Sequence, residues 1–178
     1  MASGDLPSPK KSLRAAMRRL LANLPASDPL AVDAWLRTHP APRTIAAFAA
    51  LPGEVDLMDV IARHPDRRWV FPRMEGQGLR FHAVANPAID LSTGAFGVRE
   101  PAPALPIVEI VEIDAFFCPG LAFDARGGRL GRGMGFYDRM LAHARPDALK
   151  IGVCHRAARV DDTFPESHDI AMDEVIFC

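Results

Sequence analysis

A chain of 178 residues, of which 49% are hydrophobic and 24% charged, is long enough to form one compact domain with a buried core. Its formal net charge of −1 argues against a non-specific nucleic-acid-binding protein, which needs an excess of Lys and Arg. Three cysteines without C-x-x-C spacing, and no apolar segment long enough for secretion or a membrane span, lead us to expect a cytoplasmic protein. We expect a single domain over residues 1–178, with 1–7 as a disordered tail.

The N-terminal half is predicted to alternate helices and short strands. Ser8 and Pro9 begin a helix, because Ser can cap free N–H groups and Pro at the first helical position loses no hydrogen bond. The apolar face of this helix is predicted to comprise Leu13, Met17, Leu20, Leu21 and Leu24. Later elements are a helix from Asp28-Pro29 to near His39, a strand over 44–51, a helix capped by Asp56, and strands over 69–71 and 79–84.

The C-terminal half begins with residues 86–105, which are rich in Pro, Gly and Ala and are predicted to form a long ordered loop. The expected elements after it are a strand over 115–118, a helix over 136–144, and strands over 149–153 and 174–177. Strands that alternate with helices indicate an α/β fold with a largely parallel sheet covered on both faces.

A glycine-rich segment precedes the helix predicted at 136. Gly131, Gly133 and Gly135 allow a backbone to approach another group closely, and free N–H groups at a helix start can point toward an anion. Arg129 and Arg132 add charges that suit phosphate oxygens. The spacing matches neither a Walker A loop nor the dinucleotide fingerprint. A tight turn with solvated arginines remains an equally good interpretation of this pattern.

Charged residues near the predicted helices each have two interpretations. Asp138, in the first helical turn after the glycines, either complements the helix dipole or binds Mg²⁺, and taken alone the dipole interpretation is favoured. Lys10 and Arg14 lie at the border of the apolar face, where they could reach a ligand or simply extend along the core, whereas Arg18 turns toward solvent. Taken alone, the border cations also favour the structural interpretation.

Two further segments follow or precede predicted strands. Glu54 lies just beyond the strand predicted over 44–51, and in open α/β sheets ligands bind beyond the carboxyl ends of strands. His168 and Asp169 lie in a polar turn before the last strand, where they could touch a metal or a ligand, although polar turns are common there.

Taken in order, these segments resemble the 5-formyltetrahydrofolate cyclo-ligase family. The stretches that carry the resemblance are 10–14, 51–56, 71–73, 96–101, 119–124, 128–139, 160–161 and 168–175, and together they run nearly end to end. The family implies a three-layer α/β/α sandwich similar to ribose-phosphate isomerases and CoA-transferases. It also implies ATP and Mg²⁺, with cyclisation of 5-formyltetrahydrofolate to 5,10-methenyltetrahydrofolate through a phosphorylated formyl group.

The resemblance also implies roles for individual residues. ATP would be bound by Lys10, Arg14, Arg129, Gly131, Arg132, Gly133, Met134, Gly135, Phe136 and Tyr137. The folate would contact Ala49, Glu54, Phe96 and Tyr137, and Mg²⁺ would be held by Asp138 and Asp169. Arg132 and Glu54 would act in catalysis, with Glu54 either taking the N10 proton or holding the pterin ring.

Two positions depart from the family pattern. Met134 stands where some members carry Lys, and Phe136 stands where Tyr is common. Neither changes the predicted class. The alternatives are a non-catalytic folate- or nucleotide-binding relative, and an isomerase or CoA-transferase with the same architecture. We expect a monomer or weak dimer with a small-molecule substrate and no nucleic-acid or membrane partner.

Overall fold

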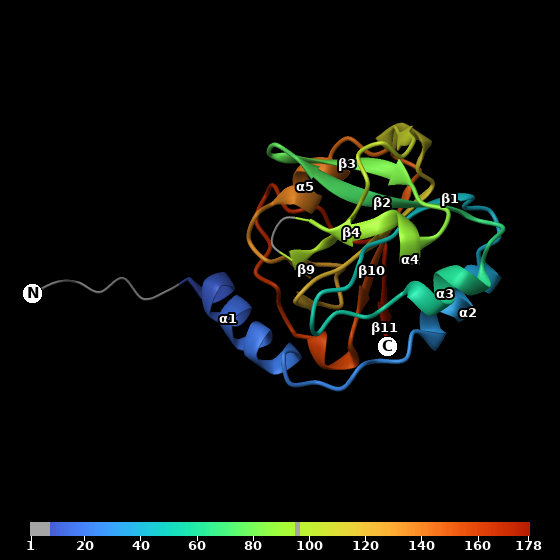
Figure 1. The fold of residues 1–178 in the computed structure, drawn as a ribbon. Coiled ribbons are helices and arrows are strands. Elements are labelled where there is room, and N and C mark those ends of the chain that lie inside the picture. Colours follow the sequence, from blue (N-terminus) through green and yellow to red (C-terminus); the bar gives the residue numbers. More distant parts are fainter. Residues whose placement is uncertain (1–7, 95–96) are drawn as a thin grey trace, which may run out of the picture.

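The computed structural model describes residues 8–94 and 97–178, and its central feature is a seven-stranded sheet (Figure 1). The strand order is β11 (Glu174–Phe177), β10 (Leu149–Cys154), β7 (Ala115–Cys118), β1 (Thr44–Ala46), β2 (Arg68–Glu75), β3 (Gly78–Ala83) and β6 (Ile107–Val108). Strands β11 to β2 in this order pair in parallel, and β3 and β6 are antiparallel. The predicted largely parallel sheet is therefore confirmed. The predicted tail, 1–7, lies outside the described residues.

Alternation along the central strands divides the apolar side chains between two cores. On β7, Ala115 and Phe117 belong to one core, whereas Phe116 and Cys118 belong to the other. Helices α2 (Leu30–Thr38) and α3 (Met58–Arg63) cover the first core, and α1 (Pro9–Leu21) and α5 (Phe136–Leu141) cover the second (Figure 1). The chain therefore has the three layers that the resemblance implied.

The first helix begins as predicted, with the Ser8 hydroxyl accepting a hydrogen bond from the Lys11 N–H at 3.3 Å. Met17 and Leu21, one turn apart, are buried against the sheet. Leu20 is 44% exposed, so its predicted place in the packed face is wrong. The buried face of α1 is narrower than the apolar pattern in its sequence, because only one side of this helix packs against the sheet.

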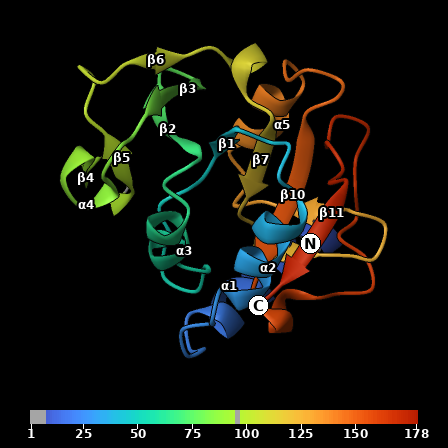
Figure 2. The same cartoon turned by 90° about the vertical axis from the view of Figure 1, so that its right-hand side faces the viewer.

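Two predicted segments have different boundaries in the structure. The strand expected over 44–51 ends at Ala46, although Phe48 and Ala49 stay buried as the chain leaves the sheet. The loop expected over 86–105 contains α4 (Pro87–Asp90), β4 (Leu91–Thr93) and β5 (Arg99–Pro101), which form a small projection beside β2 (Figure 2). Asn86 begins α4 by accepting from the Ala88 N–H, a local capping signal that the Pro- and Gly-rich composition concealed.

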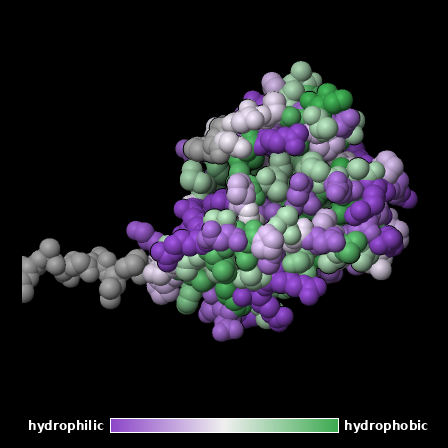
Figure 3. Space-filling model, turned by 60° about the horizontal axis from the view of Figure 1, so that its bottom comes forward, coloured by the Kyte–Doolittle hydropathy of each residue, from purple (hydrophilic) through white to green (hydrophobic). Residues whose placement is uncertain are grey.

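Short elements connect the larger ones. They are the hairpin β8 (Ala122–Phe123) and β9 (Arg129–Leu130) and the 3-10 turns Ile110–Glu112 and Arg156–Ala158. Helix α5 ends at Leu141, earlier than the predicted 144. In the part of the chain that the structure describes, no helix has the length and apolar character of a membrane span. On the face shown in Figure 3, hydrophobic residues are scattered among hydrophilic ones.

Asp124, at the turn between β8 and β9, joins this hairpin to a distant segment. Its carboxylate is 1% exposed and accepts hydrogen bonds from the N–H groups of Arg126 and Gly128 and from the N–H and hydroxyl of Thr163, at 2.7–3.1 Å. A methyl group on Gly128 would collide with this carboxylate and with the Thr163 hydroxyl. Burial alone would raise the pKa of Asp124, but these hydrogen bonds lower it from 3.8 to about 2.

We therefore expect Asp124→Asn to lose stability that depends on pH. The pKa of Asp124 is lower in the folded state than in the unfolded state. The ionised carboxylate therefore contributes about 2 kcal/mol to the free energy of unfolding above pH 3.8, and this contribution is lost as the pH falls toward about 2. Urea denaturation at several pH values should show the parent and the variant converging below pH 4, whereas the exposed control Asp161→Asn should track the parent. A constant difference between parent and Asp124→Asn at all pH values would contradict this expectation.

Candidate active site

A cavity of about 660 Å³ lies where the chain leaves the carboxyl ends of β1 and β7. Phe48 and Ala49 follow β1 and line it, as do Pro119 and Gly120 after β7. The first half of α1 borders one end, and the β2–β3 hairpin with β5 borders the other. The volume is within the range of pockets that hold cofactor-sized ligands.

The structure brings together every predicted site residue that it describes. All of the following line this single cavity: Lys10, Arg14, Ala49, Glu54, Arg129, Gly131, Arg132, Gly133, Met134, Gly135, Phe136, Tyr137, Asp138 and Asp169. Phe96 lies outside the described residues. Residues separated by more than a hundred positions in the chain are thus neighbours in one site.

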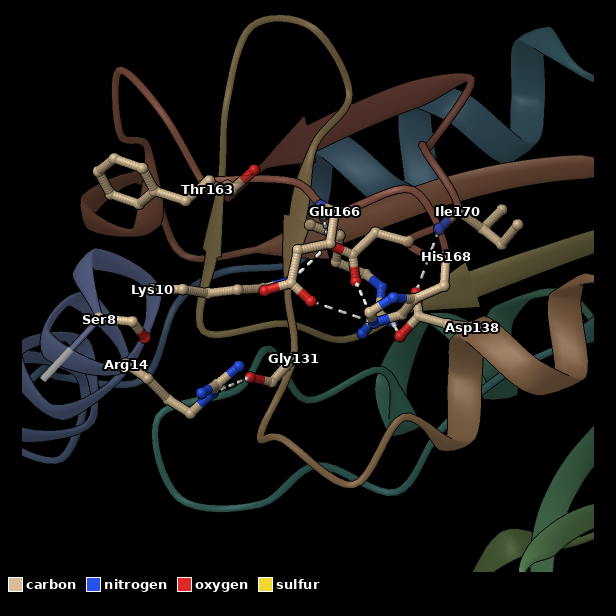
Figure 4. Close-up of polar contacts among 12 residues, drawn as sticks. Ser8, Lys10, Arg14, Gly131, Asp138, Thr163, Glu166, His168 and Ile170 are labelled. Atoms are coloured by element: carbon tan, nitrogen blue, oxygen red, sulfur yellow. Dashed lines mark hydrogen bonds and ion pairs between the residues drawn. The ribbon is translucent and has the colours of Figure 1, made fainter.

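The glycine-rich segment forms a loop between β9 and α5. Gly135 has a φ of 64°, a left-handed conformation that glycine adopts without strain, and it sets the direction in which α5 begins. Arg14 on α1 donates from Nε to the Gly131 carbonyl at 3.0 Å (Figure 4). Arg18 is exposed, as expected, but its guanidinium also donates to the Arg132 carbonyl at 2.7 Å, so it supports the loop instead of facing only solvent.

Lys10 and Asp169 form an ion pair at the end of the cavity bordered by α1. Lys10 Nζ lies 2.5 Å from Asp169 Oδ2 and 3.8 Å from Glu166 Oε2, and the side chains of Lys10 and Asp169 are each 13% exposed. In Figure 4, Lys10 extends from α1 toward the segment that carries Glu166 and His168. Burial alone would raise the pKa of Asp169, but the Lys10 hydrogen bond and charge lower it, so this residue is a carboxylate at neutral pH.

Arg129 and Asp138 form a second pair deeper in the site. Arg129 Nη2 lies 3.1 Å from both oxygens of Asp138, and the Arg129 side chain is only 4% exposed. The same carboxylate accepts from the Ile170 N–H at 3.3 Å, and the guanidinium lies 5.2 Å from the centre of the Tyr137 ring. Arg129 thereby orients Asp138, and the Asp138 carboxylate ties the start of α5 to the segment that carries Asp169.

Arg132 and Glu54 form a third pair across the middle of the cavity. Glu54 Oε1 accepts from Nε and Nη2 of Arg132 at 3.1 and 2.9 Å, and Oε2 accepts from the Leu51 N–H at 2.9 Å. Both carboxylate oxygens are therefore engaged. Next to them, burial raises the pKa of the Tyr137 phenol, which keeps this hydroxyl neutral and able to donate a hydrogen bond.

The implied Mg²⁺ can be tested against the donor atoms present. Asp138 and Asp169 supply the hard carboxylate oxygens that Mg²⁺ prefers. Residues 8–94 and 97–178 hold no cluster of three or more His, Cys, Asp or Glu side chains able to bind a metal ion by themselves. Mg²⁺ in nucleotide sites is typically held by one or two carboxylates, with phosphates and water completing the octahedron. The donors thus fit a Mg²⁺ that arrives with a nucleotide.

The end of the cavity away from α1 is mainly apolar, and sequence reasoning missed most of it. Its walls are Phe48, Leu51, Pro72, Met74, Leu79 and Val98. Pro72 and Met74 lie two residues apart on β2, so they share one face of the strand. The sequence spacing of Pro72 and Met74 indicates that they share a face of the strand. Only the pairing of β2 with β3 shows that this face lines the cavity.

Comparison with known proteins places this geometry in a family. Residues 9–178 match the 5-formyltetrahydrofolate cyclo-ligase family. A 5-formyltetrahydrofolate cyclo-ligase of Mycolicibacterium smegmatis is 33% identical over 96% of this chain and 94% of its own length. The solved structure of Aquifex aeolicus 5,10-methenyltetrahydrofolate synthetase is 28% identical, with a TM-score of 0.80 over 94% of this chain and 89% of that one. The Mycoplasma pneumoniae synthetase, at 21% identity and a TM-score of 0.73 over 94% and 98%, shares the fold. The chain belongs to the 5-formyltetrahydrofolate cyclo-ligase family.

Proposed function

We propose that this chain converts 5-formyltetrahydrofolate and ATP to 5,10-methenyltetrahydrofolate, ADP and phosphate. The observation that carries the proposal is one cavity with a cationic, glycine-lined end and an apolar end, in a chain of this family. The first end suits a polyphosphate, and the second suits the flat rings of a folate. The relatives from M. smegmatis and A. aeolicus carry names that describe this conversion.

The chemistry requires alignment more than covalent participation by the protein. The formyl oxygen attacks the γ-phosphorus of ATP, and the bond from that phosphorus to the bridging oxygen breaks to release ADP. N10 then attacks the formyl carbon and loses its proton, and phosphate leaves as the carbon–oxygen bond breaks, which completes the methenyl bridge. Cations and N–H groups positioned around the transferring phosphoryl group lower the barrier for such a step.

We assign the phosphate end to α1 and the glycine loop. Lys10 and Arg14 line the cavity from α1, Arg14 donates to the Gly131 carbonyl of the loop, and both charges are suited to phosphate oxygens. Mg²⁺, held by Asp138 and Asp169 together with the phosphates, would neutralise charge that develops on the phosphoryl group. Met134 contributes no charge to the loop where some members have Lys, and Arg132 is the cation nearest to it in sequence.

We assign Glu54 to substrate binding in preference to proton abstraction. Its oxygens already accept from Arg132 and from the Leu51 N–H, so both are held in hydrogen bonds that fix the orientation of the carboxylate. A carboxylate held in this way suits the N–H groups of a pterin edge. The Arg132 partner would hold Glu54 in place while the ring binds.

Turnover tests the proposal directly. Purified protein should convert 5-formyltetrahydrofolate to the methenyl form with one ADP released per product, and the conversion should require ATP and Mg²⁺. Absorbance of the methenyl product and a coupled ADP assay measure both yields. Binding of folate and nucleotide without product would indicate the non-catalytic relative, and isomerase or CoA-transfer activity without cyclisation would indicate the other alternative.

Substitutions on α1 test the phosphate end. Lys10→Ala and Arg14→Ala should each raise the KM for ATP about tenfold or more, because each removes a charge-assisted contact to a phosphate. Lys11→Ala is the matched control, since Lys11 is exposed and does not line the cavity. Steady-state kinetics with varied ATP measures the effect, and an equal loss in Lys11→Ala would refute the assignment.

Two carboxylate substitutions separate metal binding from structure. Asp169→Asn and Asp138→Asn should both raise the Mg²⁺ concentration needed for half-maximal rate. Asp138→Asn should also lower the free energy of unfolding by about 3 kcal/mol, because Arg129 is left buried without a counterion.

The rate is measured as a function of Mg²⁺ concentration, and stability by thermal denaturation, with Asp161→Asn as an exposed control. An unchanged Mg²⁺ dependence in both variants would mean that neither carboxylate contributes to the metal site.

A further inference from the structure

Arg99 on β5 is a cationic residue at the apolar end of the cavity. It lines the cavity together with Val98, Met74 and Leu79, which are apolar. Its Nη2 donates to the Pro87 carbonyl at 2.7 Å. Among the described residues, no carboxylate lies within ion-pair distance of its guanidinium. The charge of Arg99 is therefore held at the cavity without a protein counterion in that part of the chain.

The other cations that line the cavity differ in their partners. Lys10, Arg129 and Arg132 each face a carboxylate across the site. Arg14 resembles Arg99, because its described partner is a carbonyl. Arg14 comes from α1 and Arg99 from β5, which lie well apart on the molecule (Figure 2). Within residues 8–94 and 97–178, the cavity thus presents one cation without a carboxylate partner at each end, with apolar walls between them.

Arg99 is exposed, and its guanidinium is positioned by a carbonyl and not by a carboxylate among the described residues. Arg99 pairs with Thr93 in the β4–β5 ladder, and the bond to Pro87 fixes the guanidinium. The neighbouring Glu100 also lines the cavity, but it is buried, accepts from the Met74 N–H at 3.3 Å and lies 3.5 Å from Arg73 Nη1. Because Arg73 compensates Glu100, this carboxylate does not neutralise Arg99.

Such a cavity fits two ligands bound end to end, with an anionic group at each outer end and flat apolar rings between these groups. Phosphates account for the anion near Arg14. We infer that Arg99 binds the glutamate carboxylate at the end of the folate, and that it sets the preference for substrates that carry this tail. The inference rests on the proposed function. It adds a specificity-determining residue at the end of the cavity opposite the phosphates.

Kinetics with three substrates tests the role of Arg99. They are 5-formyltetrahydropteroate, which lacks glutamate, 5-formyltetrahydrofolate with one glutamate, and its triglutamate form. Arg99→Ala should raise the KM for the monoglutamate roughly three- to fivefold, as expected for a partly exposed ion pair, and Arg99→Glu should raise it further. The KM for 5-formyltetrahydropteroate, the KM for ATP and kcat should stay at parental values. Arg80→Ala is the matched control, since Arg80 lies on β3, pairs with Glu75 and does not line this cavity.

The outcomes separate this inference from the proposed function. A rise in KM confined to substrates with a glutamate tail supports it, and the rise should shrink at high salt because exposed charges are screened. Parental KM values for all three substrates in Arg99→Glu, or an equal rise for 5-formyltetrahydropteroate, would overturn the inference while cyclo-ligase turnover by the parent upheld the proposed function. Absence of turnover by the parent itself would refute the proposed function and this inference with it.

Discussion

The buried contact between Arg129 and Asp138 holds the candidate site together. A guanidinium that is 4% exposed needs a counterion, and Asp138 supplies both oxygens to it. Because Asp138 also accepts from the Ile170 N–H, the start of α5, the strand β9 and the segment before β11 are joined at one carboxylate. The glycine loop is thereby fixed at both ends. This contact acts together with the left-handed conformation of Gly135 and the bonds from Arg14 and Arg18 to set the shape of the loop.

Charge compensation extends through the rest of that end of the cavity. Lys10 with Asp169, and Arg132 with Glu54, bring opposite charges from distant segments to hydrogen-bonding distance. Pairs of this kind hold each side chain in a fixed orientation without ligand. Under the proposed function, the lysine and the arginine would exchange a carboxylate for a phosphate oxygen, and the carboxylate would exchange a cation for the metal. Each charged side chain would then keep a partner of opposite charge when nucleotide and metal bind.

The apolar end has a different origin. It is built where β2 extends beyond the parallel part of the sheet and pairs with β3, and where the β4–β5 projection lies against β2. Buried Glu100 fastens β5 to β2 through the Met74 N–H and Arg73. One cavity therefore combines a rigid ionic end with walls of apolar side chains, which is the combination that a phosphate donor and a ring-shaped acceptor require.

Local patterns in the sequence determined the helix starts, the buried strands and the order of elements, because capping by Ser8 and the alternation of Phe116 and Phe117 act over a few residues. The motif from Gly128 to Asp138 and the cations on α1 pointed to the same site residues. Tertiary structure alone decided that the strand from Thr44 stops at Ala46, that 86–105 contains β4 and β5, and that Leu20 faces solvent. It also decided the partners of Arg132 and Lys10. Ladder pairing and ion pairing depend on which distant segment lies alongside, and residues 78 to 159 positions apart in the chain cannot reveal that by local spacing.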